Sequence, residues 1–416
     1  MTTIRSLFVM AVLAMASACT QAQQAVMAPP PPPPPPPPTR SVVVAESSAP
    51  IVVSTASRAV IAQAARETVV VPTVFASVAE SAVVAPSARY AIVRVFFGTD
   101  RNLTGSGAPS SMFGIDRSSS MHYGFSEVSI PARHRPGELE SPSLWRLEFS
   151  QNPEEHVVLL RSSVLPKEQY FSDMAARLNA TSGSVLLFVH GYNVTFEDAA
   201  RRTAQMTYDL KFDGAPVFFS WPSKGETSLY PYDETEIEWA QGDLKRFLDD
   251  ILRRPEARNV YIVAHSMGNR ALTKSLGALL TEKPDFKSKV KEIILAAPDI
   301  DADTFKREIA PALVTSGCPI TLYASADDFA LQMSMTFHGY PRLGAGGQNR
   351  VVMPGVETVD ATGVDASFLG HSYYGSVRPV LSDISGILHN GWRAAQRVTT
   401  LSQTGVPPSA YWTVKK

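Results

Sequence analysis

The chain has 416 residues, enough for two or three domains, or for one large domain with tails. Lys and Arg total 38 and Asp and Glu total 39, so the formal net charge of -1 provides no basic surface for nucleic acid. Only two cysteines occur, Cys19 and Cys318, which excludes a disulfide scaffold and a zinc site built from cysteines. Any chemistry must therefore use other residues.

Residues 1–18 are typical of an export signal peptide. A short basic lead precedes the apolar run Leu7–Ala16, which is about half of the ~20 residues that a membrane-spanning helix needs. The small residues before Cys19 resemble the processing box of bacterial lipoproteins, with alanine where that box usually has leucine. We therefore expect cleavage before Cys19 and lipidation of its thiol. The alternative is a plain secretory signal, cleaved near Ala22 or Ala25.

A lipid on Cys19 would anchor the protein in the cell envelope. Lipoproteins retained in the inner membrane carry aspartate after the cysteine, so Thr20 indicates by analogy an outer-membrane lipoprotein that faces the periplasm or the surface. Cys318 would then have no partner. It lies beside the apolar run Ile320–Ala324, so we expect it to be packed rather than reactive.

Residues 19–89 are expected to form a disordered linker. Pro29–Pro38 is an unbroken proline run, which adopts polyproline II at ~3.1 Å per residue and makes a semi-rigid spacer of roughly 30 Å. Such a run can also be an SH3-type ligand, but an exported chain of bacterial appearance favours the spacer. Residues 41–89 are rich in Ala, Val, Ser and Thr without a clear period, and extend this linker.

Strand and helix patterns alternate over residues 90–395, the predicted folded domain. Tyr90–Phe97, Val128–Pro131 and His156–Leu160 are strand candidates that indicate an antiparallel leading portion. Five short, wholly apolar runs follow: Val185–Val189, Pro216–Trp221, Val260–Ala264, Ile293–Ala297 and Ile320–Ala324. Such runs indicate strands that are buried on both faces, as in a parallel sheet.

Helical periods separate these runs. One apolar face is marked by Ile237, Leu244, Phe247, Leu248, Ile251 and Leu252, and another by Leu272, Leu276, Leu279 and Leu280. Thr195 followed by Asp198 predicts a capped helix that runs through Tyr208. We therefore predict a mostly parallel α/β sheet with helices on both faces, and residues 396–416 as a C-terminal tail. The ligand site of such a sheet lies beyond the carboxyl ends of its strands.

The run Val260–Ala264 leads directly into His265-Ser266-Met267-Gly268 and a helix, which is the context of a nucleophile elbow. Small residues on either side, here Ala264 and Gly268, let the strand and the helix approach closely. Ser266 is the candidate nucleophile, although a serine at a helix start is often only an N-cap. The pair His190-Gly191 ends an earlier strand, so the backbone N–H groups of Tyr192 and Met267 are candidate oxyanion donors. We expect His190 to orient that loop rather than to act as a base.

The acid and the base should follow the serine in the chain. Asp328, after the run Ile320–Ala324, is the preferred acid and Asp327 its competitor; the alternative is that both only cap the next helix. Asp299, Asp301 and Asp303 form a second acidic set, of which Asp303 looks more like the cap of a helix over residues 304–313. His371, in a loop after the predicted strand Val356–Asp360, is the preferred base. His338 is its rival, and the nearby glycines predict an irregular loop there.

These segments resemble the α/β-hydrolase superfamily, and more closely a bacterial branch of esterase/lipase-like proteins of uncharacterised activity. The match spans roughly residues 90–392 and includes Phe96–Arg101, Phe188–Asn193, Phe219–Ser223, Ala264–Arg270, Ala297–Asp299 and Gly370–His371. The resemblance implies an α/β-hydrolase fold, a triad of Ser266, Asp328 and His371, and oxyanion donors at Met267 and Tyr192.

The expected activity is hydrolysis of carboxylic esters, lipid esters among them, through an acyl-enzyme. It needs neither a metal nor an organic cofactor, and its partners are a small-molecule or lipid ester and the membrane. Acid should inactivate the enzyme as His371 protonates near ~6.5. The segments 224–238 and 332–354 carry aromatic and Met residues that suit either an apolar lid or a cover for the sheet edge. The alternatives are an amidase or thioesterase with the same triad, and a catalytically silent envelope-binding lipoprotein.

Overall fold

The computed structural model describes residues 89–142, 148, 150–364 and 378–416 of the chain. The chain divides into two units, Met1–Pro72 and Thr73–Lys416, and every described residue belongs to the second. The predicted signal peptide, Cys19 and His371 lie outside the described residues. Of the helices that are described, none has the length and apolar character to cross a membrane.

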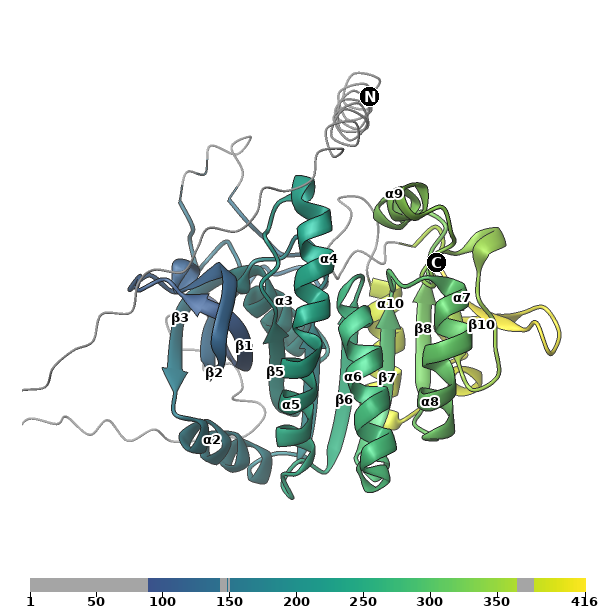
Figure 1. Cartoon of the computed structure of the whole chain (residues 1–416). Coiled ribbons are helices and arrows are strands. Elements are labelled where there is room, and N and C mark those ends of the chain that lie inside the picture. The colour runs from purple at the N-terminus through teal and green to yellow at the C-terminus, as the bar shows by residue number, and fades with distance from the viewer. Residues whose placement is uncertain (1–88, 143–147, 149, 365–377) are drawn as a thin grey trace, which may run out of the picture. The chain divides into compact units, whose positions relative to one another are not determined.

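One sheet of eleven strands organises this unit (Figure 1). The strands are β1 (Tyr90–Leu103), β2 (Phe113–Pro131), β3 (Val158–Leu165), β4 (Ser184–Val189), β5 (Gly214–Ser220), β6 (Asn259–His265), β7 (Val290–Ala296), β8 (Ile320–Ala324), β9 (Glu357–Asp360), β10 (Leu401–Thr404) and β11 (Tyr411–Val414). Their spatial order is β10-β11-β9-β8-β7-β6-β4-β5-β1-β2-β3. Pairing is parallel from β1 through β5, β4, β6, β7, β8 and β9 to β11, and antiparallel for β1–β2, β2–β3 and β10–β11. The predicted mostly parallel sheet with an antiparallel leading portion is confirmed.

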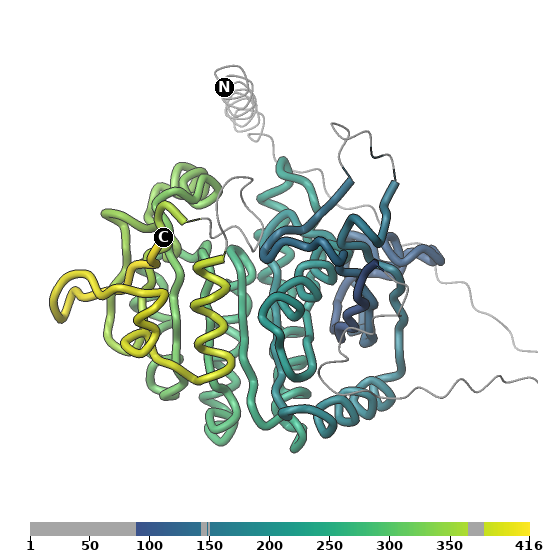
Figure 2. The backbone as a smooth tube through the Cα atoms, turned by 180° about the vertical axis from the view of Figure 1, so that it is seen from behind, coloured from purple at the N-terminus to yellow at the C-terminus, as the bar shows by residue number. Residues whose placement is uncertain are grey.

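Helices cover both faces of the sheet, as predicted. They are α2 (Lys167–Asn179), α3 (Phe196–Asp209), α4 (Tyr230–Trp239), α5 (Gln241–Leu252), α6 (Gly268–Glu282), α7 (Ala302–Thr304), α8 (Ala310–Thr315), α9 (Phe329–His338) and α10 (Arg378–Asn390). Short 3-10 turns lie at Pro109–Ser111, Thr227–Leu229, Pro284–Ser288, Gly347–Asn349 and Ala394–Gln396, and a π-helical turn at Phe305–Ile309. One face carries α2, α5, α6 and α8, and Figure 2 shows α3 and α10 on the opposite face.

The five apolar runs form strands of the sheet interior, where successive side chains point to opposite faces and both faces are covered, so that every residue can be apolar. Every residue of β4, β5 and β8 is buried. Two apolar clusters, one on each side of the sheet, take alternate residues of these strands: Leu187 belongs to one, and Leu186 and Phe188 belong to the other. The capping box of Thr195 and Asp198 opens α3 as predicted.

Three local predictions need correction. Residues 396–416 are not a tail, because β10 and β11 lie in that segment and β11 pairs in parallel with β9. These strands have four residues each and are only partly buried, so they lack a strong apolar pattern. The single apolar face from Ile237 to Leu252 belongs to two helices, α4 and α5. His338 ends α9 instead of lying in an irregular loop.

Candidate active site

Ser266 lies in the turn between β6 and α6, where the sequence predicts a nucleophile elbow. Its φ of +48° is in the left-handed region, which is strained for a residue with a side chain. The Ser266 N–H donates to the Ala296 carbonyl of the neighbouring strand at 3.0 Å. A Cβ at position 268 would lie 2.2 Å from the His190 carbonyl oxygen, so only glycine fits there. The strand, the tight turn and the helix therefore meet as the motif requires.

Asn269 fixes the shape of this elbow, a role that we did not predict. Its side-chain amide donates to the carbonyls of Ala264 at 3.2 Å, Ser266 at 3.0 Å and Ala296 at 3.3 Å. Asn269 is fully buried, and its contacts bind the end of β6 and the end of β7 to the first turn of α6. The side chain thus stabilises a backbone conformation that is unfavourable on its own.

The loop after β4 lies directly against the elbow. A Cβ added to Gly191 would lie 2.9 Å from Ser266 Cβ and from His265 Nδ1, so the two loops are in close contact. The backbone N–H groups of Tyr192 and Met267 make no hydrogen bond to another described residue. An oxyanion hole needs donors that are available to the substrate, and the assignment of these two N–H groups to that role stays a prediction.

His190 makes the orienting contacts expected of it. Its Nδ1 donates to the Gly191 carbonyl at 2.8 Å, and its Nε2 accepts from the Trp221 N–H at 3.1 Å. The ring stacks on Trp221 with centroids 5.0 Å apart. Burial, together with the nearby charge of Arg101, lowers the pKa of His190 to about 3. His190 is therefore a neutral ring with both nitrogens engaged, which suits positioning of the loop.

The preferred acid Asp328 and its competitor Asp327 follow β8. They lie at the same edge of the sheet as Ser266, which follows β6, and β7 lies between these two strands. Asp328 is half-buried and caps α9, because its Oδ1 accepts from the Leu331 N–H at 3.0 Å. Asp327 is exposed, and its Oδ2 accepts from the Gly363 N–H at 2.7 Å. The capping role considered from the sequence is therefore present for Asp328.

Asp299, from the second acidic set, is the centre of a buried polar cluster. The carboxylate pairs with Arg270 at 3.1 Å and with Arg342 at 3.2 Å, and it accepts from the hydroxyls of Tyr230 and Ser334. Burial opposes its ionisation, yet the charges of Arg270 and Arg342 and the hydroxyl donors keep the pKa of Asp299 below its usual value. With both oxygens so engaged, Asp299 is better suited to tying α4, α6 and α9 together than to holding an imidazole.

The other two aspartates of that set have different roles from those predicted. Asp301 is the cap of α7, because its Oδ1 accepts from the Thr304 N–H at 2.8 Å. Asp303, the predicted cap, is exposed and pairs with Lys306 at 2.7 Å. The cap lies two residues earlier because the helix begins at Ala302.

The rival base His338 has both ring nitrogens engaged by residues of α4 and α9. Its Nε2 lies 2.8 Å from a Glu234 carboxylate oxygen, and its Nδ1 lies 2.8 Å from the Ser334 carbonyl. These contacts join α9 to α4. His371, the preferred base, lies outside the described residues.

Helices α4 and α9, here called the cap helices, lie beyond the carboxyl ends of the strands (Figure 1). Each buries part of its surface, and Ile237 and Leu331 are in the core. Each also exposes aromatic side chains: Tyr232 is 60% exposed, Phe329 58% and Phe337 63%. Cys318, by contrast, is buried as predicted, and burial raises the pKa of its thiol.

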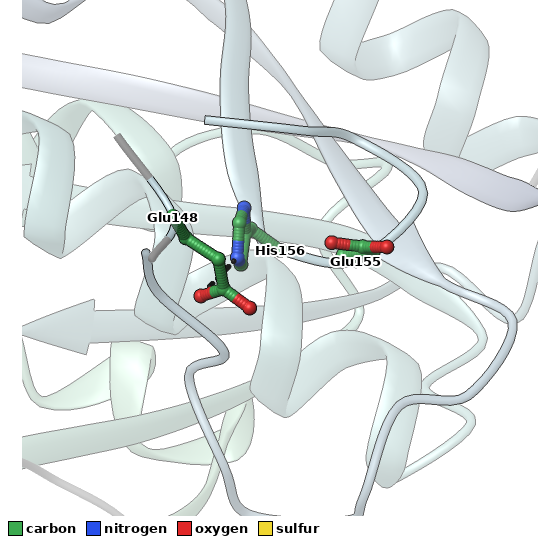
Figure 3. Close-up of side chains that lie close together, drawn as sticks. All are labelled: Glu148, Glu155 and His156. Atoms are coloured by element: carbon green, nitrogen blue, oxygen red, sulfur yellow. Dashed lines mark hydrogen bonds and ion pairs between the residues drawn. The ribbon is translucent and has the colours of Figure 1, made fainter. Parts of the chain in front are cut away.

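The side chains of Glu148, Glu155 and His156 lie close enough together to be tested as a metal site (Figure 3). His156 Nδ1 accepts from the Asn152 backbone N–H at 3.0 Å, so the ring proton sits on Nε2, which lies 3.2 Å from Glu148. A histidine that binds a metal coordinates through an unprotonated nitrogen and donates through the other one. In His156 the unprotonated nitrogen Nδ1 is occupied by a backbone N–H, and the nitrogen that faces the carboxylate carries the proton. The three residues are therefore better explained as a hydrogen-bonded turn than as a metal site.

The comparison with known protein families supports the predicted fold class. A family model described as an alpha/beta hydrolase of unknown function (DUF900) matches residues 167–387. No curated protein matches the chain.

Similar solved structures include a predicted CIB-like hydrolase from Thermoplasma acidophilum, with 10% identity, 72% of this chain and 99% of that chain covered, and a TM-score of 0.31. Lipase B from Aspergillus fumigatus has 13% identity, with 50% of this chain and 52% of that chain covered, and a TM-score of 0.27. Esterase B from Lactobacillus rhamnosis has 9% identity, covers 65% and 76% of the two chains, and has a TM-score of 0.26.

Proposed function

Since the chain belongs to the alpha/beta hydrolase family of unknown function that matches residues 167–387, we propose that it is a serine hydrolase of carboxylic esters, lipid esters among them. The observation that carries the proposal is the left-handed turn at Ser266, with the Gly191 loop packed against it. A serine held in this way presents its hydroxyl at the carboxyl edge of the sheet, where substrates of α/β folds bind.

The proposed reaction has two halves. His371 takes the proton of the Ser266 hydroxyl while Ser266 Oγ bonds to the ester carbonyl carbon. The carbonyl oxygen becomes an oxyanion, which accepts hydrogen bonds from the backbone N–H groups of Tyr192 and Met267. The carbon–oxygen bond to the alcohol then breaks, and the alcohol leaves with the proton from His371. The same imidazole then takes a proton from water, whose oxygen bonds to the acyl carbon. The bond from that carbon to Ser266 Oγ breaks, the carboxylic acid leaves, and the imidazole returns its proton to Oγ.

The triad acid in this proposal is Asp328, with Asp327 as the alternative. A carboxylate that bonds the imidazole fixes its tautomer and stabilises its cationic form. Alanine at the position of the triad acid should lower kcat by about 10⁴-fold, which is the usual effect of removing the group that orients the imidazole. Alanine at the other position should leave kcat nearly unchanged. Steady-state kinetics of Asp328→Ala and Asp327→Ala separate the two.

Turnover of p-nitrophenyl esters tests the nucleophile. Ser266→Ala should lose the activity. The matched control is Ser275→Ala, since Ser275 is a buried serine on α6, the helix that follows Ser266, and its hydroxyl donates to the Gln241 carbonyl. Activity that survives in a well-folded Ser266→Ala protein would contradict the proposal.

Matched ester, thioester and amide substrates test the class of bond that is cleaved. We expect the ester to give the highest kcat/KM. A preference for the thioester or the amide would favour the alternative activities of the same site, and absence of turnover on all three would favour a silent envelope-binding protein.

We further propose that the protein is an outer-membrane lipoprotein, attached through Cys19. The sequence before Cys19 and the proline run after it support the proposal. Replacing Cys19 by Ser and fractionating cells should move the protein out of the membrane fraction, and unchanged membrane association would contradict the anchor.

A further inference from the structure

We propose that Asp233 and Arg101 are positioning residues for the oxyanion loop, here defined as residues 190–194. This inference rests on the proposed function. Neither residue belongs to the proposed triad or supplies an oxyanion donor, and both act through the backbone of the loop that carries the Tyr192 N–H.

Asp233 holds the loop from α4. Its Oδ2 accepts from the Asn193 N–H at 3.1 Å and from the Ser223 hydroxyl at 2.6 Å, and its Oδ1 accepts from the Lys224 N–H at 2.8 Å. The side chain is fully buried. Burial raises the pKa of Asp233, opposed by these three donors and by the charge of Arg101. A buried carboxylate with three donors is therefore committed to fixing the backbone after Tyr192.

Ser223 carries this contact one residue further. Its hydroxyl donates to Asp233 and accepts from the Val194 N–H at 3.1 Å. Two consecutive N–H groups of the loop, at Asn193 and Val194, are thus bonded to one buried network. Asn193 adopts a φ of +58°, a left-handed conformation that asparagine tolerates better than most residues, and these hydrogen bonds hold it there.

Arg101, on β1, holds the same loop through different atoms. Its guanidinium donates to the Val194 carbonyl at 2.8 Å, the Ser223 carbonyl at 2.9 Å and the Ser220 hydroxyl at 2.9 Å. Ser220 in turn lies 3.2 Å from His190 Nε2. Burial lowers the pKa of Arg101 to about 10, so it remains a cation at neutral pH. The charges of Arg101 and Asp233 each shift the pKa of the other toward its ionised form.

The contacts of Asp233 and Ser223 occupy two backbone N–H groups of the oxyanion loop and leave that of Tyr192 for a substrate. Those of Asn193 and Val194 are bonded, whereas the Tyr192 N–H makes no bond to a described residue. The Tyr192 hydroxyl donates to the Thr227 carbonyl, which fixes the side chain of the same residue. Loss of the network should therefore move or loosen the Tyr192 donor, and an error of about 1 Å in such a group can cost 10²-fold in rate.

Two variants break the network with little change in volume. Asp233→Asn must turn an amide NH2 toward one of the donors that now face the carboxylate, because backbone N–H groups lie at both oxygens. Ser223→Ala removes the acceptor of the Val194 N–H. The matched control is Asp383→Asn, since Asp383 is also fully buried and accepts from the Tyr323 and Thr400 hydroxyls, but lies on α10.

The first test is steady-state hydrolysis of p-nitrophenyl esters by the folded protein. The second is amide hydrogen exchange of the same folded protein, read from a proteolytic peptide that contains residues 190–194. We expect both loop variants to lose roughly 10- to 100-fold in kcat with KM within about twofold, and to exchange faster in the loop. Asp383→Asn should lose stability while keeping kcat. If Asp233→Asn does not fold, Ser223→Ala, which removes a single oxygen, decides the matter.

Wild-type kcat in the loop variants would overturn the inference and leave the proposed function standing. So would a rise in KM at constant kcat, because that marks uniform binding and not a donor used in the transition state. Wild-type protein without Ser266-dependent turnover would overturn the proposed function and the oxyanion role together, so the two failures are distinguishable.

Discussion

The edge of the sheet at β4, β5 and β6 differs sharply from the cap helices above it. At the edge, polar side chains such as Arg101, His190 and Asn269 are buried and bonded to backbone. The cap helices instead expose large aromatic side chains. Under the proposed function, the buried hydrogen bonds would fix the chemical groups, and the exposed apolar side chains would be available to variable parts of a substrate.

The elbow should tolerate change least. In Gly268→Ala the new Cβ would lie 2.2 Å from the His190 carbonyl oxygen and 2.9 Å from that of Val189, and both are backbone atoms that cannot move alone. We expect kcat to fall more than about 100-fold and the free energy of unfolding to fall by about 1–3 kcal/mol. Gly277→Ala on the same helix is the control, because its Cβ would meet Ala312 at an ordinary 3.6 Å. Equal behaviour of the two variants, in kinetics and in urea unfolding, would contradict this account of the elbow.

The Asp299 cluster connects the two regions, so its loss should affect stability most. Asp299→Asn removes the carboxylate that the buried Arg342 shares with Arg270, which is half-buried and keeps its pair with Glu234. The expected loss is about 3–5 kcal/mol in the free energy of unfolding, measured by urea titration at pH 7. Because its folded pKa is lowered, the contribution of Asp299 is present above the unfolded value of ~3.9 and is lost as pH falls through the folded one. A destabilisation that persists unchanged in acid would argue against this cause.

A charged contact far from the site provides a test of stability without activity. Burial would lower the pKa of His134, but hydrogen bonds to Asp209 and Glu140 raise it to about 9. The contribution is therefore complete below the unfolded value of ~6.5 and is lost as pH rises through about 9. His134→Asn should destabilise the protein by up to about 3 kcal/mol at pH 6.5 and much less at pH 10, with kcat unchanged. A difference that does not shrink with pH would count against a protonated His134.

The cap helices should show the smallest effect on stability. Phe337 is 63% exposed on α9, so Phe337→Ser should change the free energy of unfolding by no more than about 0.5 kcal/mol. If α9 contacts the acyl chain, KM should rise for long-chain esters and stay constant for acetate. Identical KM values for all chain lengths would remove α9 from substrate binding.

Much of the fold could be predicted from the sequence because its central strands are buried on both faces. The run Ile320–Ala324 coincides with β8, and the capping box at Thr195 begins α3 as expected. Strands β10 and β11 could not be predicted, since partly exposed strands of four residues lack an apolar run and depend on the edge of β9 for pairing.

The elbow was predictable because its residues are adjacent in the chain, whereas the network that holds the oxyanion loop was not. Asp233 lies in an acidic stretch that reads as a solvated helix face, and its partner Asn193 is 40 residues away. Arg101 reaches Val194 across 93 residues, a contact without any local signal. The joint position of Ser266, Asp328 and His371 stays a prediction, because His371 lies outside the described residues.

The most direct test of the central claim is intact-mass analysis of the protein after reaction with a fluorophosphonate, followed by peptide mapping. We predict a single adduct, located on Ser266, that is abolished in Ser266→Ala and retained in Ser275→Ala. No adduct on the folded wild-type protein, or an adduct that survives in Ser266→Ala, would contradict the assignment of Ser266 as the nucleophile.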